Sequence, residues 1–128
     1  MIGKKIPIPE YHDARGVLMA INEIPFEAKR AFFVYSVPKD EERGNHFSKT
    51  SQFLYIVIEG FCMVILDNGF YTESYELTPG EALLFPRNTW MKIYDFEKDT
   101  VLCVLSDNEY RQSDYSSNYE EFKRIVRE

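Results

Sequence analysis

The sequence predicts an all-β fold, a jelly-roll sandwich or barrel of short antiparallel strands with one helix at the carboxyl end. Three observations predict this fold. Eight strand-sized apolar runs, rich in aromatic and β-branched side chains, follow one another along the chain. The segments between them carry Gly, Pro, Asn or Asp, which favour turns. Helical periodicity is found only near the carboxyl terminus.

The eight runs are each five to eight residues long, a usual length for a strand. They cover residues 17–21, 31–37, 53–59, 61–66, 70–77, 81–86, 90–96 and 100–106. Asn68-Gly69 lies between two of them. Both residue types tolerate positive φ, so this pair predicts a two-residue hairpin turn.

The expected helix begins near Ser117, which forms a candidate capping box with Glu120 three residues later. Its apolar residues fall on one helical face. They are Tyr119, Phe122, Ile125 and Val126. We therefore expect this helix to pack on the outside of the sheets.

The composition indicates one folded domain over residues 1–128, with 45% hydrophobic and 16% aromatic residues to build a core. The formal net charge of −6 argues against nucleic acid and against an anionic membrane surface as partners. A local cluster of Arg and Lys could still hold an anionic ligand.

Cys62 and Cys103 both lie inside apolar runs, which predicts buried free thiols in a reducing compartment. The amino-terminal stretch "MIGKKIPIPEYHD" has no sustained apolar segment typical of a signal peptide. No run approaches the ~18 apolar residues of a membrane span. We expect a soluble, cytoplasmic protein.

The stretch "ERGNHFSK" at 42–49 holds His46, one of only two histidines in the chain. Its pattern is H-x-S-K. A transition-metal site needs about three or four converging N, O or S ligands. A single imidazole is better suited to acid–base chemistry, because it titrates near neutrality.

Several segments resemble the cupin-type dTDP-4-keto-6-deoxyglucose 3,4-ketoisomerases, also called WxcM-like sugar ketoisomerases. They are "DARGVLMAINE" (13–23), "IPFEAKRAFFVYSVP" (24–38), "RGNHFSK" (43–49), "VILDNG" (64–69) and "YDFEKDTVLCVLSDNEYRQSDYSSNYEEF" (94–122). The resemblance extends from about residue 8 to 125. It implies a small cupin jelly roll, a homodimer with exchanged N-terminal strands, no metal and no other cofactor. It also implies a role in making deoxysugars for surface polysaccharides.

The chain departs from the family pattern at two places. The family loop typically reads R-G-x-H-x-H-K, and here Ser48 replaces the second histidine. A Trp-His pair on a later strand is replaced by Trp90-Met91. The metal-ligand positions of broader cupins correspond to His46, Ser48, Gln52 and Met91. Only one of these four is a usual ligand, so we expect no metal.

Ketoisomerisation requires a base that moves a proton between neighbouring carbons and a donor that polarises the carbonyl oxygens. The resemblance makes His46 the candidate base. Ser48 is too weak a base by itself, but it could hydrogen-bond an enediol oxygen or hold a water. We predict both as catalytic residues.

A nucleotide sugar offers a diphosphate for Arg or Lys and a flat base for aromatic stacking. The substrate-binding candidates, most of them matched to the family, are Arg43, Lys49, Trp90, Arg30, Tyr35 and Arg15. Arg43 is expected on the diphosphate, and Trp90 is expected in the pocket wall. His12 is expected to be solvated, although strand exchange could bring it to a partner's site.

The main hypothesis is a metal-independent 3,4-ketoisomerase acting on a dTDP-4-keto-6-deoxyhexose. The alternative is a non-catalytic cupin that binds a nucleotide sugar and lost activity with the second histidine. A related isomerase or epimerase acting on another activated sugar is a third possibility. The residues do not choose between sugars.

Overall fold

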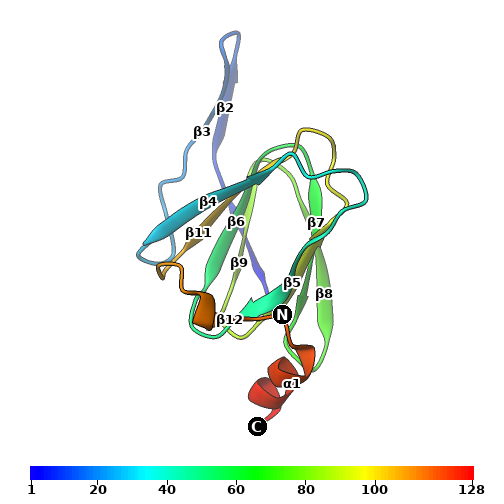
Figure 1. The fold of residues 1–128 in the computed structure, drawn as a ribbon. Helices are drawn as coiled ribbons and strands as arrows, with labels where there is room; N and C mark the ends of the chain where they lie inside the picture. The colour runs from blue at the N-terminus through cyan, green and yellow to red at the C-terminus, as the bar shows by residue number, and fades with distance from the viewer.

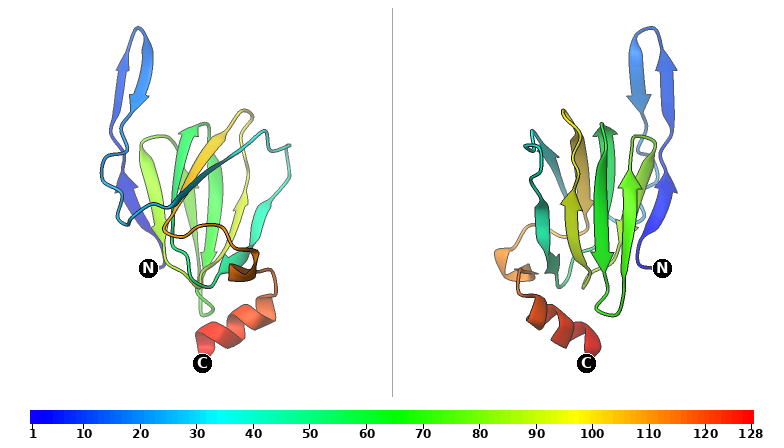
Figure 2. Two further views of the ribbon diagram at one scale, coloured as in Figure 1. Left: turned by 60° about the vertical axis from the view of Figure 1, so that its left-hand side comes forward. Right: turned by 90° about the vertical axis from the view of Figure 1, so that its right-hand side faces the viewer.

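A computed structural model describes residues 1–128 of the chain. Two five-stranded antiparallel sheets pack face to face, and a separate two-stranded hairpin extends away from them (Figure 1). The carboxyl-terminal helix lies at the end of the sandwich opposite the hairpin tip (Figure 2). The predicted all-β jelly roll with one terminal helix is confirmed.

The first sheet has the strand order β1-β9-β6-β11-β4. Its strands are β1 (Lys4–Pro7), β9 (Glu81–Phe85), β6 (Phe53–Glu59), β11 (Val101–Ser106) and β4 (Arg30–Tyr35). Side chains alternate across it, because successive residues of a strand point to opposite faces. Along β4, Phe32 and Val34 point into the sandwich and Phe33 and Tyr35 point outward.

The second sheet has the strand order β12-β5-β10-β7-β8. Its strands are β12 (Tyr115–Ser116), β5 (Arg43–Ser48), β10 (Trp90–Tyr94), β7 (Cys62–Asp67) and β8 (Thr72–Leu77). A short 3₁₀ helix, η1 (Gln112–Asp114), leads directly into β12. Strands β4 and β12 are therefore edge strands, each at one end of its sheet.

The two sheets enclose a core of fifteen buried residues, which includes Leu66, Phe85 and Leu102. A second, smaller cluster covers the outer face of the first sheet around Leu54 and Ile56. Residues from the connection between the hairpin and β4, such as Phe26, pack against this smaller cluster. Cys62 and Cys103 are buried free thiols, as predicted.

The hairpin pairs β2 (Glu10–Asp13) with β3 (Gly16–Met19). In both figures it stands clear of the two sheets. Tyr11, Val17 and Leu18 each keep more than half of their surface exposed. An isolated two-stranded hairpin is marginally stable in water, so a hairpin with these exposed apolar side chains is expected to pack against another surface.

The helix α1 (Tyr119–Arg127) packs outside the second sheet, as predicted. Phe122 is fully buried against Phe47, with ring centroids 5.1 Å apart. The predicted capping box is wrong: the side chain of Asn118, not Ser117, accepts a hydrogen bond from the Glu121 amide. No helix of the protein has both the length and the apolar character needed to cross a bilayer.

All eight predicted strands are present, with ends that differ by one or two residues. The predicted two-residue turn at Asn68-Gly69 is wrong, because Asp67 pairs with Thr72 and leaves a four-residue loop. The Asn68 side chain accepts from the amides of Phe70 and Tyr71 and so stabilises the longer loop. Only Gly69 takes a positive φ there.

Candidate active site

A β-bulge in β5 sets the position of His46. Met91 pairs with His46 and Lys92 pairs with Gly44, so Asn45 is left over between them. Gly44 and Asn45 both have positive φ, of 90° and 60°. A Cβ on Gly44 would lie 2.5 Å from the Met91 sulfur, which makes glycine necessary at this close approach. The bulge leaves His46 directed into the sandwich.

The imidazole of His46 lines a cavity of about 70 Å³ between the two sheets. The first sheet contributes Phe32, Val34, Phe53, Tyr55 and Val104, and the segments around β5 and β10 contribute Arg43, Gly44, His46, Ser48, Thr89, Met91 and Ile93. Most of this lining is apolar. A mostly apolar lining with a few converging polar groups is usual for small-molecule sites, but such sites commonly enclose about 300–1,000 Å³, so this cavity admits only part of a larger ligand.

His46 is held as a neutral base. Burial, and then the positive charge of Arg43, lower the pKa of its imidazole below the usual 6.5. Its Nδ1 is buried and has no hydrogen-bond partner in the protein. Buried polar atoms are rarely left unpaired, and exceptions are found at catalytic sites, so this nitrogen marks His46 as a candidate functional residue.

Ser48 is tied into a cluster of hydroxyls around one carboxylate. Its Oγ donates to Asp114 Oδ2 at 2.7 Å and accepts from the Ser51 amide at 3.0 Å. The hydroxyls of Thr50 and Ser51 also donate to Asp114, at 2.6 and 2.9 Å. We call this arrangement of Ser48, Thr50, Ser51 and Asp114 the hydroxyl clamp. The Ser48 hydroxyl is therefore already engaged with protein atoms.

The clamp favours an ionised Asp114. Burial by itself raises the pKa of this carboxyl, but the hydroxyls of Thr50, Ser48 and Ser51 together outweigh burial and hold the pKa below its usual value. Each hydrogen bond to the charged form stabilises it relative to the protonated form. Asp114 is the last residue of η1 and so determines where β12 begins.

Tyr115, the first residue of β12, lies beside the histidine. Its ring stands perpendicular to the His46 ring with centroids 5.3 Å apart. Its phenol oxygen accepts a hydrogen bond of 2.6 Å from Arg30 Nη1. The Arg30 guanidinium also lies 4.3 Å from the Phe32 ring centroid and 4.9 Å from that of Tyr110. Arg30 thus joins the cavity wall to the β12 segment.

Trp90 and Lys49 lie away from the cavity. Trp90 packs on the outer face of the second sheet against Phe47, Tyr119 and Phe122. The expectation that Trp90 walls the pocket is wrong for this cavity, because the strand turns its side chain toward α1. Lys49 pairs with Glu121 of α1 at 3.1 Å.

Three further predicted residues lie far from His46 in this chain. Tyr35 is 65% exposed on the outer face of the first sheet. Arg15 is at the hairpin tip, where its guanidinium pairs with Asp13 at 2.6 Å. His12 is exposed on the same hairpin, 3.6 Å from a Glu10 oxygen. Of the six substrate-binding candidates, only Arg43 and Arg30 approach the histidine.

The structure brings together no group of three or more His, Cys, Asp or Glu side chains with a geometry suited to a metal ion. Gln52 donates its amide to Asp107 at 3.0 Å and is not free to join His46. Met91 is buried in the core and packs against Gly44.

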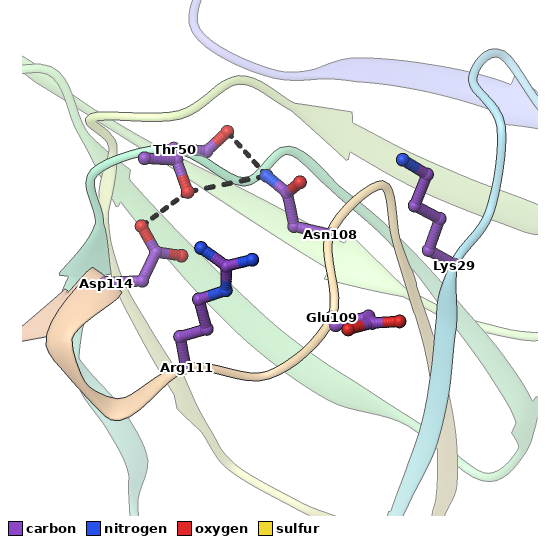
Figure 3. Close-up of a pocket in the computed structure, with 6 residues that line it drawn as sticks. All are labelled: Lys29, Thr50, Asn108, Glu109, Arg111 and Asp114. Atoms are coloured by element: carbon purple, nitrogen blue, oxygen red, sulfur yellow. Dashed lines mark hydrogen bonds between the residues drawn. The ribbon is translucent and has the colours of Figure 1, made fainter.

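A larger polar pocket of about 540 Å³ adjoins the hydroxyl clamp (Figure 3). Its lining residues are Lys29, Thr50, Asn108, Glu109, Arg111 and Asp114. Its two cations are matched by two carboxylates, and it contains no imidazole. The smaller cavity, which His46 lines, is therefore the better candidate for acid–base chemistry.

Sequence reasoning missed the β12 segment. None of the site residues predicted from the sequence lies in the stretch 109–122, yet this stretch supplies Asp114 to the clamp and places Tyr115 beside the histidine. Asp114 is 66 residues from Ser48, so no local spacing could have revealed the contact. Gly44 was a usable signal, since glycine inside a strand often marks a bulge.

A two-sheet jelly roll with an imidazole in a cavity between its sheets defines a cupin-type small-molecule site. The comparisons agree with this class. The family described as FdtA, WxcM-like, C-terminal matches residues 3–127, and the chain belongs to that family.

Three relatives cover nearly the whole chain. The TDP-4-oxo-6-deoxy-α-D-glucose-3,4-oxoisomerase of Aneurinibacillus thermoaerophilus is 33% identical, over 98% of this chain and 94% of its own. A 3,4-ketoisomerase from Helicobacter canadensis has a TM-score of 0.91, 31% identity and 98% coverage of both chains. A mutant 3,4-ketoisomerase from Thermoanaerobacterium thermosaccharolyticum, solved with TDP-4-keto-6-deoxyglucose, has a TM-score of 0.92 and 27% identity over 98% of this chain and 94% of its own. These relatives do not favour a non-catalytic binding protein.

Replacing Arg43 with Gln should raise the pKa of His46 toward its usual value, because the imidazolium loses a repulsive neighbouring charge. An NMR titration of the imidazole resonances measures this directly, with His12→Asn to assign the signals. Lys49→Gln is the matched control, since Lys49 is paired with Glu121 and should leave His46 unchanged. An unchanged titration in Arg43→Gln would contradict the electrostatic role of Arg43.

Introducing the second family histidine by Ser48→His should destabilise the protein and bring no gain in activity. Ser48 is 3% exposed, so the larger side chain overpacks the site and breaks the hydroxyl clamp. Ser48→Ala removes only the hydroxyl and should cost about 1.5–3 kcal/mol, as expected for a hydrogen bond to a charged group. Urea unfolding compares both with the wild type. A Ser48→His protein of wild-type stability would refute this account.

Proposed function

We propose that this protein is a 3,4-ketoisomerase acting on a TDP-4-keto-6-deoxyhexose in deoxysugar biosynthesis, with His46 as its base. The observation that carries the proposal is the position of His46, whose imidazole is kept neutral by burial and by Arg43, in the wall of a largely apolar cavity. Membership of the ketoisomerase family supports it. The acidic composition and buried thiols are consistent with a cytoplasmic enzyme.

The cavity suits proton transfer next to a carbonyl. A base must be neutral to accept a proton from carbon, and the lowered pKa of His46 keeps it neutral near pH 7. The same imidazole can then return the proton to the neighbouring carbon. The apolar walls limit competition from water and strengthen electrostatic interactions inside the site.

The small volume of the cavity constrains how a nucleotide sugar binds. Only the reacting part of the hexose enters, and the diphosphate and base lie outside. Arg43 is exposed at the rim and close enough to His46 to affect its pKa. We assign Arg43 to the diphosphate, since a guanidinium can pair with phosphate through two hydrogen bonds. Arg15, Lys49 and Tyr35 stay as weaker binding candidates.

We also propose a homodimer in which the N-terminal strands reach across to the partner. The hairpin stands clear of its own chain and exposes Tyr11 and Leu18. The outer face of the first sheet exposes Phe33 and Tyr35 beside the smaller apolar cluster. Contiguous exposed apolar surface of this kind marks interaction sites. Such an exchange could bring His12 or Arg15 to the partner's cavity.

The isomerase proposal is tested with TDP-4-keto-6-deoxyglucose in deuterated water. We expect conversion to the 3-keto isomer with deuterium incorporated at carbon, followed by NMR and mass spectrometry. His46→Asn should lower kcat by about 100-fold or more, since it removes the base. Arg124→Gln, on the exposed face of α1, is the control and should leave kcat unchanged. Bound TDP-sugar without exchange or turnover in the wild type would instead support a binding protein.

The dimer proposal is tested by size-exclusion chromatography with light scattering. We expect twice the 15.1 kDa chain mass. Leu18→Asp and Phe33→Glu each place a charge on the proposed interface and should shift the protein toward monomer. Arg124→Glu on the exposed face of α1 is the control and should not. A monomeric wild type would disprove the assembly.

A further inference from the structure

The proposed reaction needs a proton transfer at oxygen as well as at carbon, and His46 accounts only for the carbon. This inference rests on the proposed isomerase function. The Ser48 hydroxyl donates to Asp114 and is not free to serve. Another group beside His46 must polarise the carbonyl oxygen and exchange protons with it.

Tyr115 has the required position. Its ring contacts His46 at 5.3 Å and Phe53 at 6.5 Å, and both of those residues line the cavity. The ring is half-buried on β12, the edge strand of the second sheet. Tyr115 is not itself a lining residue, but its ring lies directly beside two residues of the cavity wall.

The hydrogen bonding of Tyr115 leaves its own proton available. The phenol oxygen accepts from Arg30 Nη1 at 2.6 Å, and the phenol O–H has no protein acceptor. When the proton leaves, the charge on oxygen develops beside a guanidinium already in hydrogen-bonding contact. Such preorganised stabilisation of a developing anion is a large contribution in enzyme catalysis.

We propose that Tyr115 is the second catalytic residue of this site, donating its phenol proton to the substrate carbonyl oxygen while Arg30 stabilises the phenolate. The hydroxyl clamp acts through Tyr115 as a positioning device, because Asp114 directly precedes it. The position that carries the second histidine in the family therefore supports this tyrosine here instead of contacting substrate.

The proton balance closes with these two groups. His46 takes the proton from C3 as the C4 oxygen takes the phenol proton, which gives a 3,4-enediol, an imidazolium and a phenolate. The phenolate then takes the proton from the C3 hydroxyl as the imidazolium returns its proton to C4. The product is the 3-ketone, and both residues regain their starting protonation. No oxidant or reductant is consumed.

Tyr55 is the other phenol near the cavity, and it is less suited to the role. It is 4% exposed, and burial strongly raises the pKa of its hydroxyl. No cation hydrogen-bonds to it, so a phenolate at Tyr55 would be buried without a partner. Burial also raises the pKa of Tyr115, but there the hydrogen bond from Arg30 opposes it.

Tyr115→Phe is the direct test, because it keeps the ring and removes the hydroxyl. We expect kcat to fall by about 100-fold or more, with KM and the affinity for TDP unchanged. Tyr110→Phe is the matched control: Tyr110 stacks on Tyr115 at 5.7 Å and contacts the same arginine. The control should keep wild-type kcat.

A second measurement separates proton transfer from a structural role. Trifluorotyrosine at position 115 has a more acidic phenol, so the alkaline fall in kcat should move to lower pH. The same substitution at position 110 should not move it. Trifluorotyrosine at position 115 leaves every charged or titratable group that faces Tyr115 unchanged. These groups are Arg30, His46, Asp114, Tyr110 and Tyr55.

Each outcome decides the inference. If Tyr115→Phe turned over near the wild-type rate, the role of Tyr115 would be overturned and the isomerase function would stand. The same conclusion would follow if fluorination at position 115 did not shift the alkaline part of the pH profile of kcat. No turnover by the wild type would overturn both. Loss of TDP affinity in Tyr115→Phe together with kcat would show that Tyr115 only supports binding, which also refutes the inference.

Discussion

Three hydroxyl groups converge on the carboxylate of Asp114, and the arrangement of the site depends on that contact. The clamp adds to the two-residue pairing of β12 with β5 and to the hydrogen bond between Arg30 and Tyr115 in holding the segment after β11 against the sandwich. The clamp also lies next to the cavity wall, because Ser48 belongs to both. A buried carboxylate that accepts three hydrogen bonds specifies one position for the chain, since a displacement would leave the charge without these donors.

The outer face of β5 packs against the helix, and its inner face carries the histidine of the candidate site. Phe47 points outward and packs under α1 with Trp90 and Phe122, so this face anchors the helix. His46 points inward to a cavity where its nitrogen has no partner. The bulge at Gly44 and Asn45 sets this division, because a shift of one residue in a strand exchanges the two faces. The histidine is therefore unsatisfied within a rigid, well-packed frame, as expected of a functional group.

The sequence predicted the secondary structure more accurately than it predicted the directions of individual side chains. The alternating and apolar runs identified eight strands, and the helical period identified α1 with Phe122 on its buried face. The sequence did not predict which side chains form local hydrogen bonds. The helix cap is Asn118 and not Ser117, and the loop after Asp67 has four residues and not two. Trp90 was expected in the pocket, but its strand direction turns it toward the helix. These errors concern side-chain direction, which depends on register and packing.

The sequence by itself determined the fold class, the family and the histidine, because hydrophobic periodicity, turn residues and contiguous motifs are local properties of the chain. Only the tertiary structure decided what surrounds that histidine. Asp114 and Tyr115 reach β5 across more than sixty residues, and Arg30 reaches Tyr115 across 85. Pairings at such separations result from the packing of two sheets, and no spacing within the chain encodes them.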